Sequence, residues 1–335
     1  MIIFFLKKLR KLFKSIGKFE NTIIDKLVLL DNPSKFSGKK LILKSDHFNN
    51  LHNKLNQKKN YPKKLVIVIC FFYNKNKIKI LKKTLDMINS YDFKIDLTLI
   101  TNNISFNEKK ILKKLTPPKI KKIDIHVIRE LPDNNLLPWY SITIMKQKFK
   151  NKSNSHFMFL EDDILISNEN ICYWVYFRKL LKKLNLVPGF LRYENYKKNL
   201  YSVDNPKKII LKKSPKIQFE NNNFGFVNSK YPYSAMYLMD RDMMDEYLKS
   251  DATKVDFSFT NKFMKSTFPI KELLNISYAY LNVPTGFHNK LMIPYLDKKI
   301  IPDYCLIKHS EVKYANSNKL EYMSFGKIKI KDLIN

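Results

Sequence analysis

The sequence has few cysteines, few arginines and none of the glycine-rich phosphate-binding motifs. Three cysteines, Cys70, Cys172 and Cys305, lie far apart and form no CxxC pair. This spacing argues against a zinc site and indicates a reducing compartment. No GxGxxG or GxxxxGK[ST] segment follows the first apolar run, so the sequence supports neither a dinucleotide-binding fold nor a P-loop.

The basic residues are nearly all lysine. Lysine and arginine number 62 against 30 acidic residues, which gives a formal charge of +32, yet only five of the 62 are arginine. Phosphate recognition favours the arginine fork, and the sequence contains no RNP, KH, zinc-finger or helix-turn-helix pattern. We therefore expect no nucleic-acid partner. The positive field would instead concentrate a small anionic substrate near the protein.

Residues 1–16 combine apolar and basic side chains. The first apolar stretch is too short to cross a bilayer and lacks the order of a signal peptide, so we expect a cytoplasmic protein. From Phe5 to Ile16, apolar residues recur at helical spacing with basic residues between them. Such a helix can lie on an anionic membrane, here the inner face, and packing against the domain is the alternative interpretation.

From Lys63 onward, apolar runs alternate with amphipathic segments. The apolar runs predict strands at 65–72, 95–100, 123–128 and 157–160. The intervening segments predict helices at 78–88, 107–115 and 138–149. This alternation predicts right-handed βαβ units and therefore an α/β fold with a mainly parallel sheet.

The second half of the chain is less regular. It predicts a helix at 169–184, strands at 189–192 and 233–239, and a helix at 241–249. The polar, turn-rich segment 195–232 is expected to form excursions over one end of the sheet. The predicted organisation is a basic helical extension at 1–60, a catalytic domain at 61–315 and a C-terminal tail at 316–335.

Three acidic residues follow the fourth predicted strand. Phe157–Leu160 runs directly into Glu161, Asp162 and Asp163, after which the sequence becomes apolar again. Carboxylates crowded in this way repel one another unless a cation or a sugar hydroxyl offsets the charge. Open α/β sheets bind ligands at this edge of their strands. In the alternative interpretation, Asp162 and Asp163 only form a turn or start a helix.

A βαβαβ half that ends in such a triplet resembles the nucleotide-sugar glycosyltransferases of the GT-A fold and their DXD motif. Glu161 stands where the family usually has aspartate. Segments 188–192, 231–237 and 283–288 are similar to stretches of little-described bacterial glycosyltransferase-like proteins. The resemblance covers residues 63–315. It implies a Rossmann-like mixed sheet flanked by helices, with a nucleotide-binding half at 61–166 and an acceptor half at 167–315.

The resemblance also implies a reaction and a metal. The expected enzyme is a hexosyltransferase-like protein of polysaccharide biosynthesis. It would move a sugar from a nucleotide-sugar, with a UDP-sugar as first choice, to a glycan or lipid-linked acceptor. Mn²⁺ or Mg²⁺ would bind the oxygens of the departing diphosphate.

Several residues receive roles from this resemblance. Asp163 would be the principal metal ligand, Glu161 would lie near the metal and the ribose or donor sugar, and Asp162 would assist. His309 is the first choice for a late histidine ligand and His288 the second. A structural role is the alternative for either histidine.

Other candidates lie at the remaining strand ends and in the second half. Phe72, Tyr73 and Asn74, with Thr101 and Asn102, would meet the nucleotide base, unless they are ordinary polar loop residues. If the reaction inverts the anomeric centre, Asp240, Asp242 and Glu194 are candidates for the base that activates the acceptor hydroxyl. Arg192 could pair with phosphate, and structural ion pairing is the alternative.

Two other functional classes compete with this hypothesis. A metal-dependent phosphohydrolase or nuclease also gathers acids at strand ends, although it would need more acids or histidines to hold two metals. A non-catalytic basic module at a membrane surface is the third hypothesis, because a fold alone does not establish activity.

Overall fold

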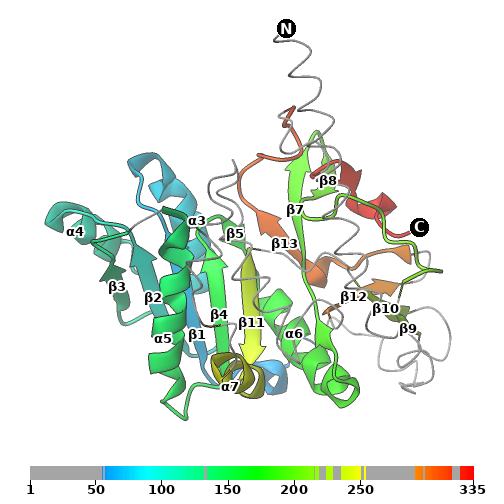
Figure 1. The fold of residues 1–335 in the computed structure, drawn as a ribbon, viewed down its shortest axis with the longest axis horizontal. Coiled ribbons are helices and arrows are strands. Elements are labelled where there is room, and N and C mark those ends of the chain that lie inside the picture. The colour runs from blue at the N-terminus through cyan, green and yellow to red at the C-terminus, as the bar shows by residue number, and fades with distance from the viewer. Residues whose placement is uncertain are drawn as a thin grey trace, which may run out of the picture.

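The computed structural model describes most of the chain from residue 57 onward (Figure 1). The described residues are 55, 57–131, 134–214, 216–218, 224–228, 235–249, 253, 291–296, 299–318 and 325–335. The predicted helix at 5–16 and the alternative histidine ligand His288 lie outside these residues. The domain boundaries drawn from the sequence stay predictions.

A five-stranded sheet forms the first half of the fold, with strand order β11-β4-β1-β2-β3. Its strands are β1 (Leu65–Phe71), β2 (Ile95–Thr101), β3 (Ile123–Val127), β4 (His156–Glu161) and β11 (Met236–Asp240). The strands β1 to β4 are parallel to one another, and β11 is antiparallel to β4. This arrangement confirms the predicted α/β class and its mixed, mainly parallel sheet.

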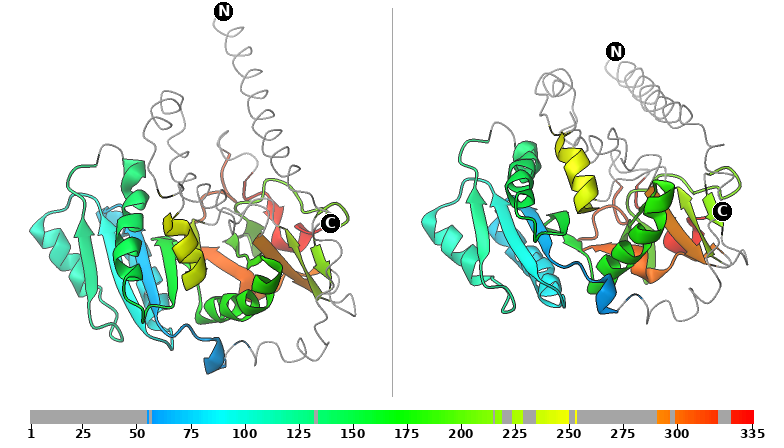
Figure 2. Two further views of the ribbon diagram at one scale, coloured as in Figure 1. Left: turned by 60° about the horizontal axis from the view of Figure 1, so that its bottom comes forward. Right: turned by 90° about the horizontal axis from the view of Figure 1, so that it is seen from below.

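Helices cover both faces of this sheet. They are α3 (Ile78–Asn89), α4 (Phe106–Lys114), α5 (Tyr140–Phe149) and α7 (Arg241–Lys249), with α6 (Asn168–Leu181) further along the molecule (Figure 2). The chain crosses from β1 to β3 through α3 and α4 and returns to β4 through α5. Because such crossovers are right-handed, the outward and return helices lie on opposite faces. All seven residues of β1 are consequently buried, which explains its uninterrupted apolar sequence.

Local sequence signals set several helix starts. Ser105 before α4 and Ser167 before α6 each accept a hydrogen bond from the third residue of the helix, whose side chain bonds back to the serine. These capping boxes satisfy backbone N–H groups that the first turn leaves without partners. Short 3₁₀ helices η3 (Lys58–Asn60), η4 (Lys75–Lys77), η5 (Asn134–Trp139), η6 (Lys182–Leu184), η9 (Asp303–Cys305) and η11 (Ile330–Asp332) complete the described helices.

Two further sheets form the second half. One has the order β14-β8-β7-β13-β5, with β5 (Ile164–Leu165), β7 (Leu191–Tyr196), β8 (Asn199–Ser202), β13 (Leu306–His309) and β14 (Ile328–Lys329). The other has the order β6-β12-β10-β9, with β6 (Val187–Pro188), β9 (Lys216–Gln218), β10 (Phe224–Asn228) and β12 (Leu291–Leu296). Segment 195–232 therefore supplies strands of two sheets, which corrects the expectation of excursions over the first sheet. The predicted tail supplies β14 and the buried Leu333.

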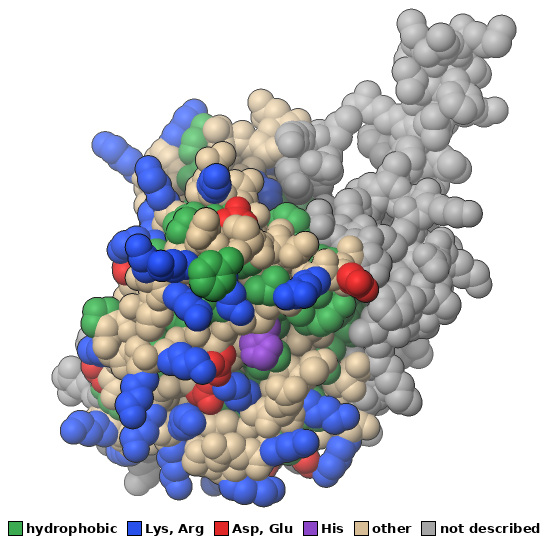
Figure 3. Space-filling model, turned by 90° about the vertical axis from the view of Figure 1, so that its left-hand side faces the viewer, with side chains coloured by type: hydrophobic (Ala, Val, Ile, Leu, Met, Phe, Trp, Pro, Cys, Tyr) green, Lys and Arg blue, Asp and Glu red, His purple; other side chains and the backbone are tan. Residues whose placement is uncertain are grey.

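Basic side chains are frequent on the surface, as the composition predicts. Figure 3 shows lysine and arginine side chains spread over the described part of one face, with acidic side chains among them.

The three cysteines are free and buried. Within the described ranges, no helix combines the length and the apolar character that crossing a membrane requires.

We expect His156 to make stability depend on pH. Burial lowers the pKa of this first residue of β4 to about 4, although Asp240 nearby opposes the shift. Between about pH 6.5 and pH 4 the unfolded chain therefore binds a proton that the folded chain excludes, and acidification destabilises the fold. The unfolding temperature of the wild type should fall more between pH 7 and pH 5 than that of His156→Phe. Equal losses in the two proteins would contradict this assignment.

Candidate active site

The acidic triplet forms the turn that joins the first sheet to the second. Glu161 ends β4 opposite Cys70 of β1, and Asp162 and Asp163 lead directly into β5. The backbone carbonyl oxygen of Asp162 accepts a hydrogen bond of 2.6 Å from the hydroxyl of Thr84 on α3. The carbonyl oxygen of Asp163 accepts one of 2.8 Å from the backbone N–H of Ser310. The turn, which we call the acidic turn (Glu161–Asp163), is thus held by α3 on one side and by the residue after β13 on the other.

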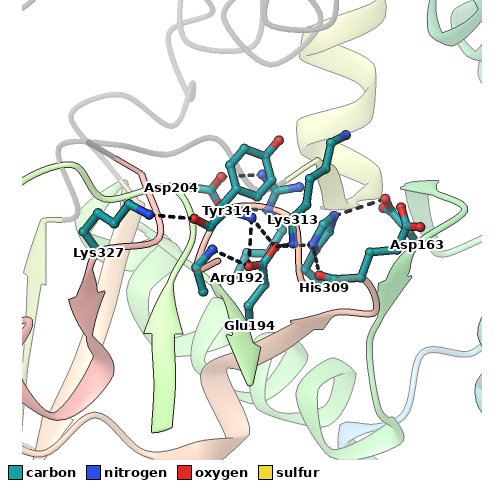
Figure 4. Close-up of polar contacts among 10 residues, drawn as sticks. Asp163, Arg192, Glu194, Asp204, His309, Lys313, Tyr314 and Lys327 are labelled. Carbon is teal, nitrogen blue, oxygen red and sulfur yellow. Dashed lines mark hydrogen bonds and ion pairs between the residues drawn. The ribbon is translucent and has the colours of Figure 1, made fainter. Parts of the chain in front are cut away.

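His309 reaches the acidic turn from the second sheet. It ends β13, whose antiparallel pairing with β5 places His309 opposite Ile164. Its Nε2 lies 3.1 Å from Oδ2 of Asp163, and its Nδ1 lies 2.8 Å from Oε1 of Glu194 (Figure 4). The structure therefore brings together the predicted metal ligand Asp163 and the first-choice histidine, although 146 residues separate them in sequence.

Crowding and burial divide the three carboxyls into two kinds. Burial, with the Asp163 carboxylate next to it, raises the pKa of Glu161 to about 8 and that of Asp162 to about 7. Burial also opposes the ionisation of Asp163, but the hydrogen bond and charge of His309 outweigh it and lower the pKa of Asp163. Burial likewise disfavours the charged form of His309, yet Asp163 and Glu194 raise its pKa to about 9. The negative charge of the turn is therefore concentrated on Asp163, next to His309.

The acidic turn fits a divalent cation. Oδ1 of Asp163 and Oδ2 of Asp162 are buried and have no hydrogen-bond partner. Mg²⁺ takes oxygen ligands and is usually held by one or two carboxylates of the protein. Among the described residues, no three His, Cys, Asp or Glu side chains form a group that could hold a metal. The fit is thus to an ion that completes its shell with substrate oxygens and water.

Arg192 lies one strand away from His309 and forms a buried ion pair. On β7, it donates from Nε at 3.1 Å and from an Nη atom at 2.6 Å to the two oxygens of Asp204. The exposed fractions of the two side chains are 3% and 7%. Its guanidinium also lies 5.6 Å from the ring centroid of Tyr314. The charge of Arg192 also lowers the pKa values of Glu161 and Asp163 in the acidic turn.

Glu194 does not fit the predicted role of an acceptor base. Its side chain is completely buried, and its oxygens accept hydrogen bonds from the backbone N–H groups of Lys313, Tyr314 and Ala315. Burial opposes its ionisation, but bonds from His309 and these N–H groups lower its pKa. A base must reach the hydroxyl whose proton it accepts. The predicted role of Glu194 as a base is therefore wrong, and its buried side chain contacts His309 instead.

Asp240 and Asp242 lie at the wrong edge of the sheet for the predicted role. Because β11 is antiparallel to β4, Asp240 pairs with His156 at the start of β4, whereas the acidic turn follows its end. Asp240 accepts a hydrogen bond of 2.8 Å from Arg178 and another from the N–H of Met243 in α7. Asp242 pairs with Lys182 on the surface. Both predictions of a catalytic base are thus corrected.

The predicted nucleotide residues meet at the carboxyl edge of the first sheet. The backbone N–H of Tyr73, after β1, donates to Oδ1 of Asn102, after β2, at 2.6 Å. The hydroxyl of Thr101 bonds the same oxygen at 3.2 Å, and Asn74 caps η4 through its contact with the N–H of Asn76. Phe72 is partly exposed beside them. The structure thus assembles this group, and its role in binding a base stays a prediction.

Three residues of the site are not expected from the sequence. Thr84 supports the acidic turn from α3, Ser310 supports it from the end of β13, and Tyr314 places its ring 5.6 Å from that of His309. The hydroxyl oxygen of Ser310 is buried without a hydrogen-bond partner. Ser310 follows the candidate ligand His309 directly, and that position is the one sequence signal that could have drawn attention to it.

Comparison with known proteins gives distant structural matches. No family model matches the chain, and no curated protein matches it. One structural match is S. aureus TarS, a glycosyltransferase, with 13% identity over 78% of this chain and 41% of that chain and a TM-score of 0.41. Another is S. aureus TarS 1-349, with 12% identity over 66% of this chain and 56% of that one and a TM-score of 0.34. The match spans less than two thirds of either TarS chain. At these scores it assigns neither a family nor an activity.

We expect the pair of Arg192 and Asp204 to be important for stability. Removing one partner of a buried pair leaves an uncompensated charge and costs about 3–5 kcal/mol. Arg192→Met should therefore lower the free energy of unfolding in urea by that amount, and Arg192→Met with Asp204→Leu should recover part of it.

The exposed pair of Lys182 and Asp242 offers a matched control, because its side chains are 51% and 69% exposed. Lys182→Met should change the same free energy by less than about 1 kcal/mol. A cost for Arg192→Met no larger than that of the control would show that the buried pair is not structural.

Proposed function

We propose that the protein is a metal-dependent glycosyltransferase that moves a sugar, with a hexose as first choice, from a nucleotide-sugar to a glycan or lipid-linked acceptor. A UDP-sugar is the first choice of donor. The proposed setting is the cytoplasm, with residues 1–16 as a peripheral contact to an anionic membrane. Mn²⁺ or Mg²⁺ is the proposed cofactor.

One observation carries this proposal. Two partnerless, buried carboxylate oxygens, on Asp162 and Asp163, lie at the carboxyl end of β4, and His309 lies against Asp163 from another sheet. Ligands of open α/β sheets bind along this edge, which here also holds the contact between Tyr73 and Asn102. Acidic oxygens for a cation and amide groups for a base on one edge suit a nucleoside diphosphate.

Each residue of the site then has a task in sugar transfer. Asp163 and His309 would hold the metal, with Glu161 close to it and near the donor sugar, and Asp162 would add a second carboxylate to the turn. The bound metal supplies charge stabilisation for the diphosphate that leaves when the acceptor hydroxyl attacks the anomeric carbon. Lys77 adds positive charge beside the acidic turn, where it lowers the pKa values of Asp162 and Asp163.

The competing phosphohydrolase or nuclease fits less well. Two-metal hydrolysis needs several acids or histidines around ions about 3.5–4 Å apart. No cluster of three such side chains suited to a metal occurs in the part of the chain that the structure describes. One acidic turn that takes its remaining ligands from the substrate agrees better with a nucleotide-sugar.

Asp163→Asn should abolish sugar transfer while the fold persists. Replacing this carboxylate removes the proposed metal ligand, and several kcal/mol of charge stabilisation corresponds to a loss on the order of 100-fold or more in kcat/KM. Transfer would be measured by mass spectrometry of the acceptor, with circular dichroism as the check on folding.

Asp242→Asn is the control for this variant, because it also replaces an aspartate by asparagine but lies on the surface at the other edge of the sheet. Its activity should stay within about twofold of the wild type. An Asp163→Asn enzyme as active as this control would eliminate the metal-site assignment.

Ligand-dependent stabilisation tests the donor class. Unfolding temperatures would be compared with UDP, GDP, CMP and their sugars, each with and without Mn²⁺. A ligand that binds only the folded state at 100 times its Kd stabilises it by about 2.7 kcal/mol. Stabilisation by one nucleotide only with Mn²⁺ would support the proposal. Metal-dependent release of phosphate from phosphate esters, with no sugar transfer, would favour the hydrolase.

A further inference from the structure

Glu194 occupies a position that the proposed sugar transfer does not use. It lies on β7, which runs parallel to β13, with Tyr193 opposite Lys308 in the register. The next residue on each strand is Glu194 and His309, so the two side chains leave neighbouring strands at the same level. Their contact is 2.8 Å between Oε1 and Nδ1, and both residues are buried.

The contacts of His309 Nδ1 determine which atom carries a proton. This nitrogen lies 2.8 Å from Oε1 of Glu194 and 2.7 Å from the carbonyl oxygen of Glu311. A backbone carbonyl can only accept hydrogen bonds, and the Glu194 oxygens already act as acceptors for three backbone N–H groups. Nδ1 therefore donates, and the ring is oriented with Nε2 toward Asp163. In metal sites, the histidine nitrogen that does not bind the metal usually donates a hydrogen bond to a protein group, which orients the ring.

The same carboxylate organises the segment that follows His309. Backbone N–H groups of Lys313, Tyr314 and Ala315 donate to the Glu194 oxygens at 2.9, 3.0 and 2.7 Å. Successive N–H groups that converge in this way form a concave anion site, here filled by a side chain of the protein. One carboxylate thus fixes both the ring of His309 and the chain around Tyr314 (Figure 4).

We infer that Glu194 is a positioning residue, which directs Nε2 of His309 at Asp163 and anchors residues 313–315 beside the acidic turn. It touches neither substrate nor metal and acts through His309. The inference deepens the proposed function and rests on it for the metal, while the orientation of the ring is a property of the protein alone.

The test uses the full chain with Glu194→Gln. Glutamine has nearly the same shape but only one acceptor oxygen, so it cannot accept hydrogen bonds from the His309 ring and from all three N–H groups together. In the metal-free wild type, the Nδ1 proton should give a downfield, exchange-protected NMR resonance, assigned by its absence in His309→Gln. We expect Glu194→Gln to lose this resonance and to bind Mn²⁺ about 10–100-fold more weakly, as measured by electron paramagnetic resonance.

Glu311→Gln is the control that removes a nearby negative charge without removing a contact of His309 Nδ1. It removes the carboxylate of the residue two positions after His309 but keeps the backbone carbonyl that bonds Nδ1, so the downfield resonance should persist. If Glu194→Gln does not fold, Glu194→Asp keeps the charge on a shorter side chain and should also lose the resonance. In either protein, faster amide exchange over residues 313–315 would report the loss of the anchor.

The outcomes separate this inference from the proposed function. A Glu194 variant that keeps both the resonance and the wild-type affinity for Mn²⁺ would overturn the positioning role. A purely structural Glu194 would alter amide exchange and leave the ring resonance in place, which also overturns it. If the wild type binds no Mn²⁺, the metal assignment fails, and the resonance alone then decides whether Glu194 orients His309.

Discussion

Three adjacent carboxyl groups at the end of a buried strand are the constraint on which the rest of the site depends. Glu161, Asp162 and Asp163 share one turn, and burial raises the pKa values of the first two. Thr84 and Ser310 hold the backbone of the turn by hydrogen bonds to its carbonyl oxygens. These bonds restrict the backbone movements that would separate the three carboxyl groups. Asp163 keeps its negative charge because His309, 3.1 Å away, lowers its pKa.

The second sheet brings this positive charge by pairing strands that are distant in sequence. Because β5 continues directly from the acidic turn and pairs with β13, His309 is fixed beside Asp163 by backbone geometry. The parallel partner β7 then adds Arg192 and Glu194. Arg192 donates hydrogen bonds to Asp204 and its charge lowers the pKa of Asp163, whereas Glu194 contacts the ring of His309. The site is therefore a property of the junction between two sheets.

The sequence predicts the first sheet well and the second poorly, for a physical reason. Strand β1 is buried on both faces, so its apolar run from Leu65 is continuous and easy to recognise. Strand β7 mixes buried Arg192 and Glu194 with half-buried residues and one exposed residue, and charged residues are buried only when partners compensate them. Those partners, Asp204 and the N–H groups of 313–315, come from elsewhere in the chain. The sequence misplaces Asp240 because sequence order does not reveal that β11 runs antiparallel and carries it to the opposite edge.

The hydrogen-bond partners of the carboxylate oxygens in the acidic turn also indicate which kind of ligand the turn would bind. His309 compensates one oxygen of Asp163, and its other nitrogen is committed to Glu194 and the carbonyl of Glu311. Buried carboxylate oxygens normally have partners, yet Oδ1 of Asp163 and Oδ2 of Asp162 have none. A neutral ligand could donate hydrogen bonds to them but would leave the like charges opposed. We propose a divalent cation here, because it would compensate both oxygens and reduce the repulsion, and the proposed ligand is therefore a metal-bound diphosphate rather than an uncharged sugar alone.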